Sequence, residues 1–170
     1  PVLARQLDEA VDERRIDVAV HVDALDAAAG LPRVEEAAVD QVLDGVVEID
    51  FAWHFPYFDD EMGAAVGAGF ATADAMLMGR VLYEEWAAYW PEHADEPFGD
   101  VMNSMKKYVV SNSLRAASWQ NSEIVSGDVA EKLTSIKAQD GGDIAMSGSP
   151  TTARWLLREG LLDELNLLVH

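Results

Sequence analysis

Two patterns of hydrophobic positions alternate along most of the chain. Short apolar runs predict buried strands, whereas apolar residues that recur every three or four positions predict amphipathic helices. Strands are expected at residues 75–78, 107–111, 123–126, 144–147 and 164–169. Helices are expected at 80–88, 98–105, 128–138 and 150–159. This alternation predicts an α/β fold with βαβ units and a mostly parallel sheet flanked by helices.

The first part of the chain shows the same two patterns less regularly. Helical spacing occurs at residues 2–14, 34–43 and 59–71. Residues 15–22 (RIDVAVHV) alternate between apolar and polar, which predicts a strand. Residues 45–51 are β-branched and predict a further strand, followed by an aromatic loop at 53–58.

Composition narrows the class of protein. The chain has 170 residues, of which 49% are hydrophobic, so one domain with a real core is expected. There is no cysteine, which excludes disulfides and thiolate chemistry. No apolar run is long enough to cross a bilayer, and the N-terminus lacks the pattern of a signal peptide, so a cytoplasmic protein without membrane contact is expected. Four scattered histidines show no ligand spacing, so no metal site is expected.

The formal net charge of −19 argues against a nucleic-acid partner, because a phosphate backbone needs a basic surface. It also makes a phosphorylated substrate a poor match. A well-solvated acidic surface and adaptation to high salt each explain the excess of acidic over basic residues. An anionic ligand would need local help from arginine or from helix N-termini.

One candidate site lies where the strand at 144–147 leads into a helix. Gly148 separates the two, Ser149 is a suitable N-cap, and Pro150 is favoured at the first helical position. The carboxyl ends of parallel strands are where α/β folds bind ligands, and a glycine there permits close approach to the backbone. The alternative is an ordinary strand-to-helix turn, with Gly160 as the glycine that ends the helix.

Two other strand ends carry similar chemistry. Gly79 and Arg80 follow the strand at 75–78, and an arginine beside a helix N-terminus can hold a phosphate. The strand at 107–111 ends in Ser111, and Asn112 and Ser113 follow it. All three offer short hydrogen-bonding side chains. The alternatives are a surface arginine after a turn glycine and an ordinary polar loop.

Six segments together resemble a known family. They are LDGVVE (43–48), WHFPYFDDE (53–61), LMGRVLYEEWAAYWP (77–91), KKYVVSNSL (106–114), GGDIAMSGSPTTARWLL (141–157) and GLLDELNLLVH (160–170). Their order and spacing resemble the dihydrofolate reductase-like superfamily, and more closely the reductase domain of bifunctional riboflavin-synthesis deaminase-reductases, the RibD C-terminal domain group. The resemblance implies a central mixed, mostly parallel sheet with flanking helices, and NADPH as hydride donor.

The resemblance also implies roles for individual residues. Those expected to bind the cofactor are Gly79 and Arg80 at its phosphates, Ser111, Asn112 and Ser113 at the adenosine and its 2′-phosphate, and Gly148, Ser149, Thr151 and Thr152 at the pyrophosphate. Asp44, within Leu43-Asp44-Gly45, is expected near the nicotinamide and the substrate. Asp59 is a candidate substrate anchor or proton source, although two acidic residues in the first turn of a helix explain it equally well.

The chain departs from the family pattern at both ends. Residues 1–38 form an acidic extension with no match, before a reductase-like domain at 39–170. The family continues beyond LNLLVH with further strands, so an exposed sheet edge is expected. We expect residues 16–22 to pair there, in the same chain or in a partner, and a permuted order of the chain is the alternative. Absence of any backbone ladder at 16–22 would contradict both ideas.

These observations predict an NADPH-dependent reductase that transfers hydride to a small heterocyclic, pterin- or aminopyrimidine-like substrate, in a homodimer. The alternative is a non-catalytic dimeric binding or assembly module that retains the fold. The tryptophans at 86, 90, 119 and 155 and Tyr89 are expected to serve packing or interfaces.

Overall fold

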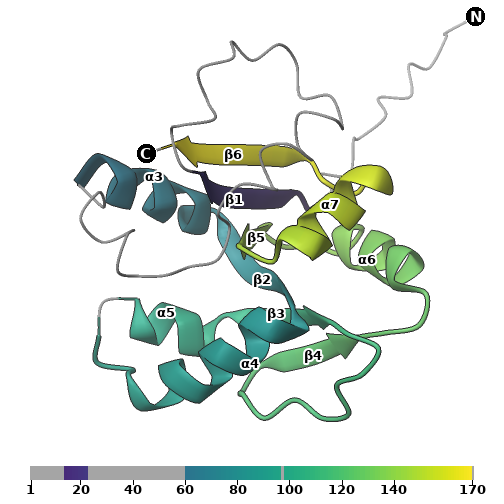
Figure 1. The fold of residues 1–170 in the computed structure, drawn as a ribbon, viewed down its shortest axis with the longest axis horizontal. Helices are drawn as coiled ribbons and strands as arrows, with labels where there is room; N and C mark the ends of the chain where they lie inside the picture. Colours follow the sequence, from purple (N-terminus) through teal and green to yellow (C-terminus); the bar gives the residue numbers. More distant parts are fainter. Residues whose placement is uncertain (1–13, 23–59, 97, 170) are drawn as a thin grey trace, which may run out of the picture.

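A computed structural model describes residues 14–22, 60–96 and 98–169. Its centre is a six-stranded sheet in the order β4-β3-β2-β5-β1-β6 (Figure 1). The strands are β1 (Ile16–Val22), β2 (Ala73–Gly79), β3 (Lys106–Val110), β4 (Ser122–Val125), β5 (Asp143–Ser147) and β6 (Glu164–Val169). All ladders between these strands are parallel. The predicted α/β class is confirmed.

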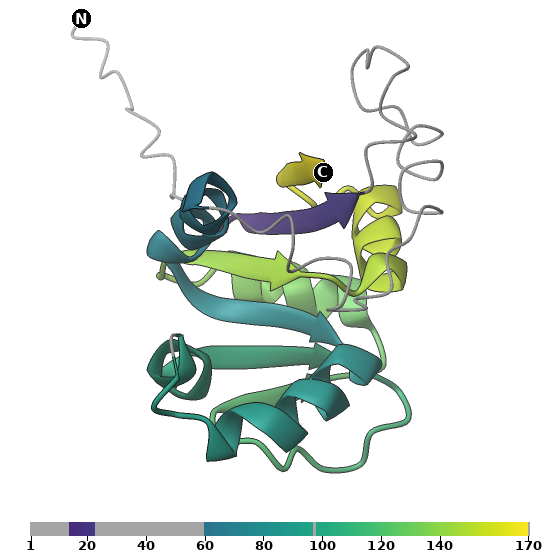
Figure 2. The same cartoon turned by 60° about the vertical axis from the view of Figure 1, so that its left-hand side comes forward.

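Helices cover both faces of the sheet (Figures 1 and 2). They are α3 (Asp60–Ala71), α4 (Arg80–Tyr89), α5 (Gly99–Ser104), α6 (Val129–Lys137) and α7 (Pro150–Arg158), with a 3₁₀ turn η3 (Trp90–Glu92) after α4. Most bounds agree with the sequence pattern to within a residue or two. No helix in the described ranges has the length and apolar character needed to cross a membrane.

The position of β2 between two layers of helices explains why residues 75–78 are apolar without interruption. Ala75 and Leu77 pack into the core beneath α6 and α7, whereas Met76 and Met78 pack into the core beneath α4 and α5. Successive side chains of a strand point to opposite faces, so a strand covered on both sides must be apolar at every position. The sheet is therefore the middle layer of three.

Strand β1 forms the backbone ladder expected for residues 16–22, and it does so within the chain. Its position differs from the expected one, because β1 lies between β5 and β6 instead of covering an open edge. Ile16 pairs with Ile144 of β5, and Asp17 pairs with Glu164 of β6. Strand β6 is consequently the outer strand, and β1 is its sole partner among the described strands.

Arg14 fixes the beginning of β1. Its side chain is buried, forms an ion pair with Asp74, and donates a hydrogen bond from Nε to the carbonyl of Gly142 at 2.8 Å. A Cβ at Gly142 would lie 2.4 Å from the carbonyl oxygen of Thr72. Gly141-Gly142 is thus a tightly packed anchor for the start of β1.

Two helix ends agree with the sequence signals. The Asp128 carboxylate accepts a hydrogen bond from the Glu131 amide and caps α6. Gly160 has a left-handed φ of 67° directly after α7, and the amide of Leu161 bonds the carbonyl of Leu156. This glycine-terminated arrangement is a Schellman motif, which sets where α7 ends.

Candidate functional site

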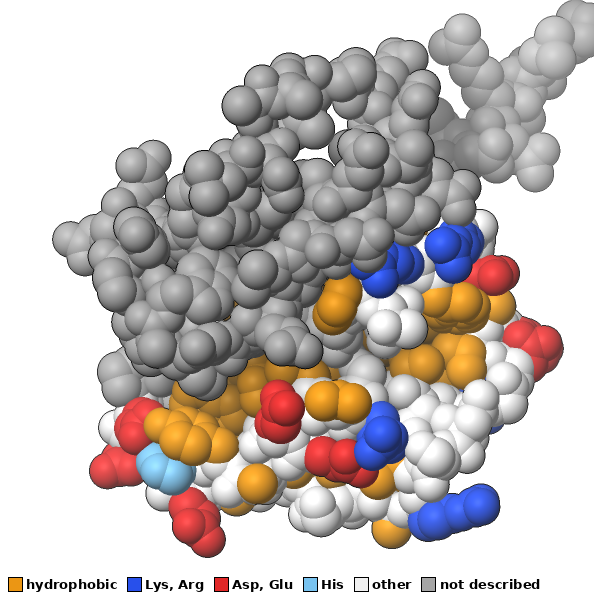
Figure 3. All heavy atoms as spheres, in the orientation of Figure 1, with side chains coloured by type: hydrophobic (Ala, Val, Ile, Leu, Met, Phe, Trp, Pro, Cys, Tyr) orange, Lys and Arg blue, Asp and Glu red, His pale blue; other side chains and the backbone are white. Residues whose placement is uncertain are grey.

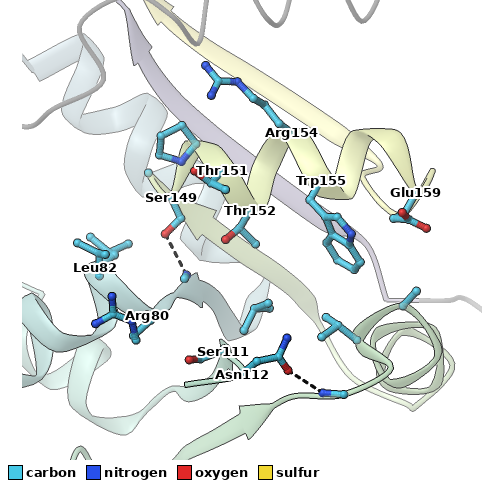
Figure 4. A pocket seen from close by; sticks show the side chains of 18 of the residues that line it. Arg80, Leu82, Ser111, Asn112, Ser149, Thr151, Thr152, Arg154, Trp155 and Glu159 are labelled. Carbon is cyan, nitrogen blue, oxygen red and sulfur yellow. Dashed lines mark hydrogen bonds between the residues drawn. The ribbon is translucent and has the colours of Figure 1, made fainter. Parts of the chain in front are cut away.

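A cavity of about 1530 Å³ opens at the carboxyl ends of the strands (Figure 4). Eight of the nine residues predicted to bind a cofactor line it: Gly79, Arg80, Ser111, Asn112, Gly148, Ser149, Thr151 and Thr152. Ser113 does not line it. Because β2, β3 and β5 are neighbouring parallel strands, residues that are far apart in sequence meet at this edge.

The turn between β5 and α7 has an unusual backbone. Gly148 and Ser149 both adopt left-handed conformations, with φ of 70° and 55°. The nearest atom to a Cβ built on Gly148 is Cδ2 of Leu82 at 3.8 Å, so Gly148 presents bare backbone to open space. A side chain here would project into the space that the glycine leaves free.

Ser149 occupies the N-cap position of α7, but its side chain does not cap the helix as predicted. The left-handed backbone directs the hydroxyl elsewhere, and Oγ accepts a hydrogen bond from the Gly79 amide at 3.0 Å. The Ser149 carbonyl is shared by the amides of Thr152 and Ala153. Within the described part of the chain, the amide of Thr151 has no hydrogen-bond partner, so it remains a donor at the cavity.

Gly79 is required for packing at the end of β2. A Cβ on Gly79 would lie 2.9 Å from the Thr152 hydroxyl oxygen and 3.4 Å from that of Ser149. The two glycines therefore do border one cavity, as the sequence predicts. The amide of Gly79 is occupied by Ser149 and is not a bare donor.

Arg80 begins α4 at the rim of the cavity. Its guanidinium forms an exposed ion pair with Glu84, one helical turn away, at 2.7 Å. A guanidinium carries five N–H donors, so contact with Glu84 leaves donors for a second anion. Arg80 lies at the start of a helix beside the cavity, as the sequence predicts, and it already forms an ion pair with Glu84.

The three polar residues after β3 have distinct roles. Ser111 is buried, and its hydroxyl accepts hydrogen bonds from the amides of Ser113 and Leu114, which shapes the loop. Asn112 accepts a hydrogen bond from the Gly127 amide at 2.9 Å and ties this loop to the one before α6 (Figure 4). Asn112 faces the cavity while holding two of its walls together.

Three helices begin at this cavity: α4 after Gly79, α6 after Asp128 and α7 after Ser149. The N-terminus of a helix carries a partial positive charge and free amides, which favour anions. The charged side chains in the wall are Arg80, Arg154, Glu85, Asp128 and Glu159. Attraction for an anion therefore comes from backbone dipoles and the two arginines, and it is opposed by three carboxylates.

Trp155, which was expected to serve packing or interfaces, packs against the core and also lines the cavity. Trp155 lies one turn after Thr151 on α7, and Glu159 follows one turn later, directly after the last residue of the helix (Figure 4). Together with Val110 and Val129, Trp155 adds apolar wall next to Asn112. The i, i+4 spacing of Thr151, Trp155 and Glu159 was a usable signal, because it places all three on one side of a helix that starts at a predicted site.

Asp44 and Asp59, the two predicted catalytic residues, lie outside the described residues. Their roles stay predictions. The described residues contain no group of three or more His, Asp or Glu side chains that could hold a metal ion.

Residues 37–170 match the RibD C-terminal domain. The chain therefore belongs to the RibD C-terminal domain family. The match covers most of the chain and all described strands except β1, which lies before it. RibD C-terminal domains have a dihydrofolate reductase-like reductase fold, so the predicted resemblance is confirmed.

A protein from Bacillus subtilis (strain 168), the uncharacterized protein YyaP, is 27% identical over 101 residues. The aligned segment covers 57% of this chain and about half, 53%, of YyaP. Because YyaP is uncharacterized, it carries no information about a substrate.

Proposed function

We propose that the chain is an NADPH-dependent reductase that acts on a small heterocyclic, pterin- or aminopyrimidine-like substrate. The observation that carries the proposal is the cavity at the starts of α4, α6 and α7, where Gly148 leaves bare backbone facing open space. Membership of a reductase family gives this cavity its chemical interpretation.

The residues present fit a dinucleotide in order along the cavity. Gly148 with the amide and hydroxyl of Thr151 would hold the pyrophosphate, because amides at a helix start favour anions. Thr152 adds a hydroxyl beside them, and Arg80 would hold a further phosphate at the rim. Trp155 offers an aromatic wall to a base.

When bound, NADPH supplies a hydride to a C=N or C=O bond, and the protein's part is to hold donor and acceptor in line and to exclude water. Ser149 and Asn112 serve this indirectly, because their hydrogen bonds fix the walls of the cavity relative to one another. Asp59 and Asp44 remain the proposed groups for anchoring the substrate and moving a proton.

The test is a titration of the protein with NADPH, followed by tryptophan fluorescence. We expect saturable quenching, most of which disappears in Trp155→Phe, because Trp155 lines the cavity. Gly148→Asp should weaken binding by at least about 100-fold, since it places a carboxylate where phosphate is expected. Arg80→Ala should weaken it by about three- to tenfold.

Gly160→Asp is the matched control for Gly148→Asp. It adds the same charge at a glycine of nearly the same φ, 67° against 70°, with no atom within 4 Å of its Cβ and outside the cavity. Its affinity for NADPH should stay within about twofold of the wild type. A flat titration of the wild type, or equal losses in both variants, would contradict the proposal and favour a non-catalytic dimeric module.

A further inference from the structure

The segment from α4 to α5 concentrates exposed apolar side chains. The described residues contain four exposed large hydrophobic side chains, Val81, Tyr89, Phe98 and Val101, and all belong to this segment. Val81 borders the cavity. The other three, called here the α4–α5 patch, lie away from it.

Hydrogen bonds to Glu96 link the end of α4 to the start of α5 at the α4–α5 patch. The Tyr89 hydroxyl donates a hydrogen bond to Glu96 at 2.6 Å, and the Glu96 carbonyl accepts one from the Gly99 amide next to Phe98. Phe98 and Val101 are one helical turn apart. Figure 3 shows hydrophobic side chains gathered around a histidine, with acidic side chains at their border.

The backbone holds Phe98 outward in a costly conformation. Its φ is 70°, in the left-handed region that non-glycine residues rarely adopt, and its side chain is 49% exposed. The next residue, Gly99, is closely packed, since a Cβ there would lie 2.3 Å from the carbonyl oxygen of His93. Backbone strain of this kind is concentrated at functional positions, and an exposed aromatic side chain is suited to anchor a partner.

The negative charge around the α4–α5 patch indicates what kind of partner would bind there. Residues 81–105 contain six acidic side chains and neither lysine nor arginine. A second copy of the chain would present the same acidic face. Residues 23–59 of the chain itself carry nine acidic side chains and a single arginine, so they are electrostatically unsuited to cover it. A basic surface is complementary.

We propose that the α4–α5 patch is a docking surface for a protein partner whose contact face is basic and carries apolar anchors. Phe98 and Val101 receive the apolar anchors, and the surrounding carboxylates pair with the partner's cations. This site is separate from the cavity and does not depend on the proposed reductase activity.

The probe is a synthetic amphipathic helical peptide of lysine and leucine, titrated into isotopically labelled full-length protein and followed by amide chemical shifts. We expect the shifts to gather at residues 89–101, and the equivalent glutamate–leucine peptide to leave them unchanged. Shifts spread over the whole surface, or no binding of the lysine peptide, would overturn the proposal.

Phe98→Gly tests the apolar anchor without endangering the fold. Glycine tolerates φ of 70°, so the variant should melt within a few degrees of the wild type while binding the peptide about tenfold more weakly. Unchanged affinity in this variant would overturn the proposal. So would a homodimer in sedimentation that Phe98→Gly dissociates, because a second copy would then occupy the patch.

A charge-matched pair of variants separates local pairing from general attraction. Glu92→Gln with Asp95→Asn should weaken binding several-fold, whereas Glu131→Gln with Asp140→Asn, which removes the same charge from another part of the surface, should change it by less than about twofold. Equal effects of the two pairs would show that only the net charge matters, and would overturn the proposal.

Discussion

At the scale of single residues, the cavity depends on a contact that only glycine permits. Strand β2 ends at Gly79, directly beneath the side chains of Ser149 and Thr152 at the start of α7. The sequence marks Gly79 as a candidate phosphate-binding residue, but its amide is bonded to Ser149. Its main structural role is to let α7 approach the sheet.

Gly79→Ala should therefore destabilise the protein by about 1–3 kcal/mol, because the new methyl group would lie 2.9 Å from the Thr152 hydroxyl oxygen. Thr152→Ala removes that oxygen, so the double variant should recover at least about half of the loss. Urea denaturation of the four proteins measures this coupling. Additive losses would show that the close contact does not exist in solution.

Lys107 is a second residue whose environment sets a measurable property. It is fully buried, donates hydrogen bonds to the carbonyls of Asn103, Met105 and Gln120, and lies 4.1 Å from the ring centre of Trp119. Burial lowers the pKa of Lys107 from 10.5 to about 8. Between these values the unfolded chain holds a proton that the folded protein lacks, so stability rises with pH.

We expect the difference in unfolding free energy between the wild type and Lys107→Met to grow in favour of the wild type as pH rises from about 8 to 10. Urea denaturation at several pH values measures it, and Lys106→Met, at an exposed pair with Glu123, is the control. A difference independent of pH would mean that the pKa of Lys107 is ordinary in the folded state.

At the scale of elements, β1 determines whether the sheet is complete. It is the sole described neighbour of β6, and Arg14 anchors its start through Asp74 and Gly142. At the other side, Asp163 accepts hydrogen bonds from the Ile16 amide and from Lys137 of α6. Removing the Arg14 side chain should therefore weaken the pairing of β6 with β1.

Arg14→Met should destabilise the protein by about 2 kcal/mol, because it removes the partner of the Asp74 carboxylate and of the partly buried Gly142 carbonyl. The exposed neighbour Arg15, paired with Glu164, is the control, and Arg15→Met should cost less than about 0.5 kcal/mol. Hydrogen exchange should accelerate in β6 more than in β3. Equal acceleration in both strands would contradict the proposed role of β1.

The elements were largely predictable, since period-2 and period-3.6 patterns follow from burial on one or both sides. The place of β1 in the sheet was not predictable, because the pattern of residues 16–22 predicts a strand but does not indicate which strands it pairs with. Eight of the positions predicted to bind a cofactor converge because parallel strands end at one edge of the sheet, which the sequence order implies. The position of Trp155 could have been predicted from its i, i+4 spacing to Thr151. The side-chain partner of Ser149 depends on tertiary packing, which no local pattern encodes.

At the scale of the whole molecule, charge should govern how an anionic ligand arrives. The net charge is −19, and carboxylates outnumber arginines around the cavity by three to two. Long-range repulsion is screened by salt, whereas contacts inside the cavity are screened less. We therefore expect an anionic ligand to be repelled as it approaches the protein and attracted once it reaches the starts of the helices.

The association rate of NADPH should rise as ionic strength increases from about 10 mM to about 150 mM, which shortens the Debye length from about 30 Å to about 8 Å. Stopped-flow fluorescence measures it. Glu85→Gln with Glu159→Gln should raise the rate at low salt more than Glu92→Gln with Glu96→Gln, which lie outside the cavity. A rate that falls with salt would show that a local basic site dominates the approach.

The most direct measurement is a crystal structure of the chain with NADPH. The account predicts the pyrophosphate against the backbone of Gly148 and the start of α7, within hydrogen-bond distance of the Thr151 amide, with the base beside Trp155. A dinucleotide bound elsewhere, or an empty cavity at saturating NADPH, would contradict it.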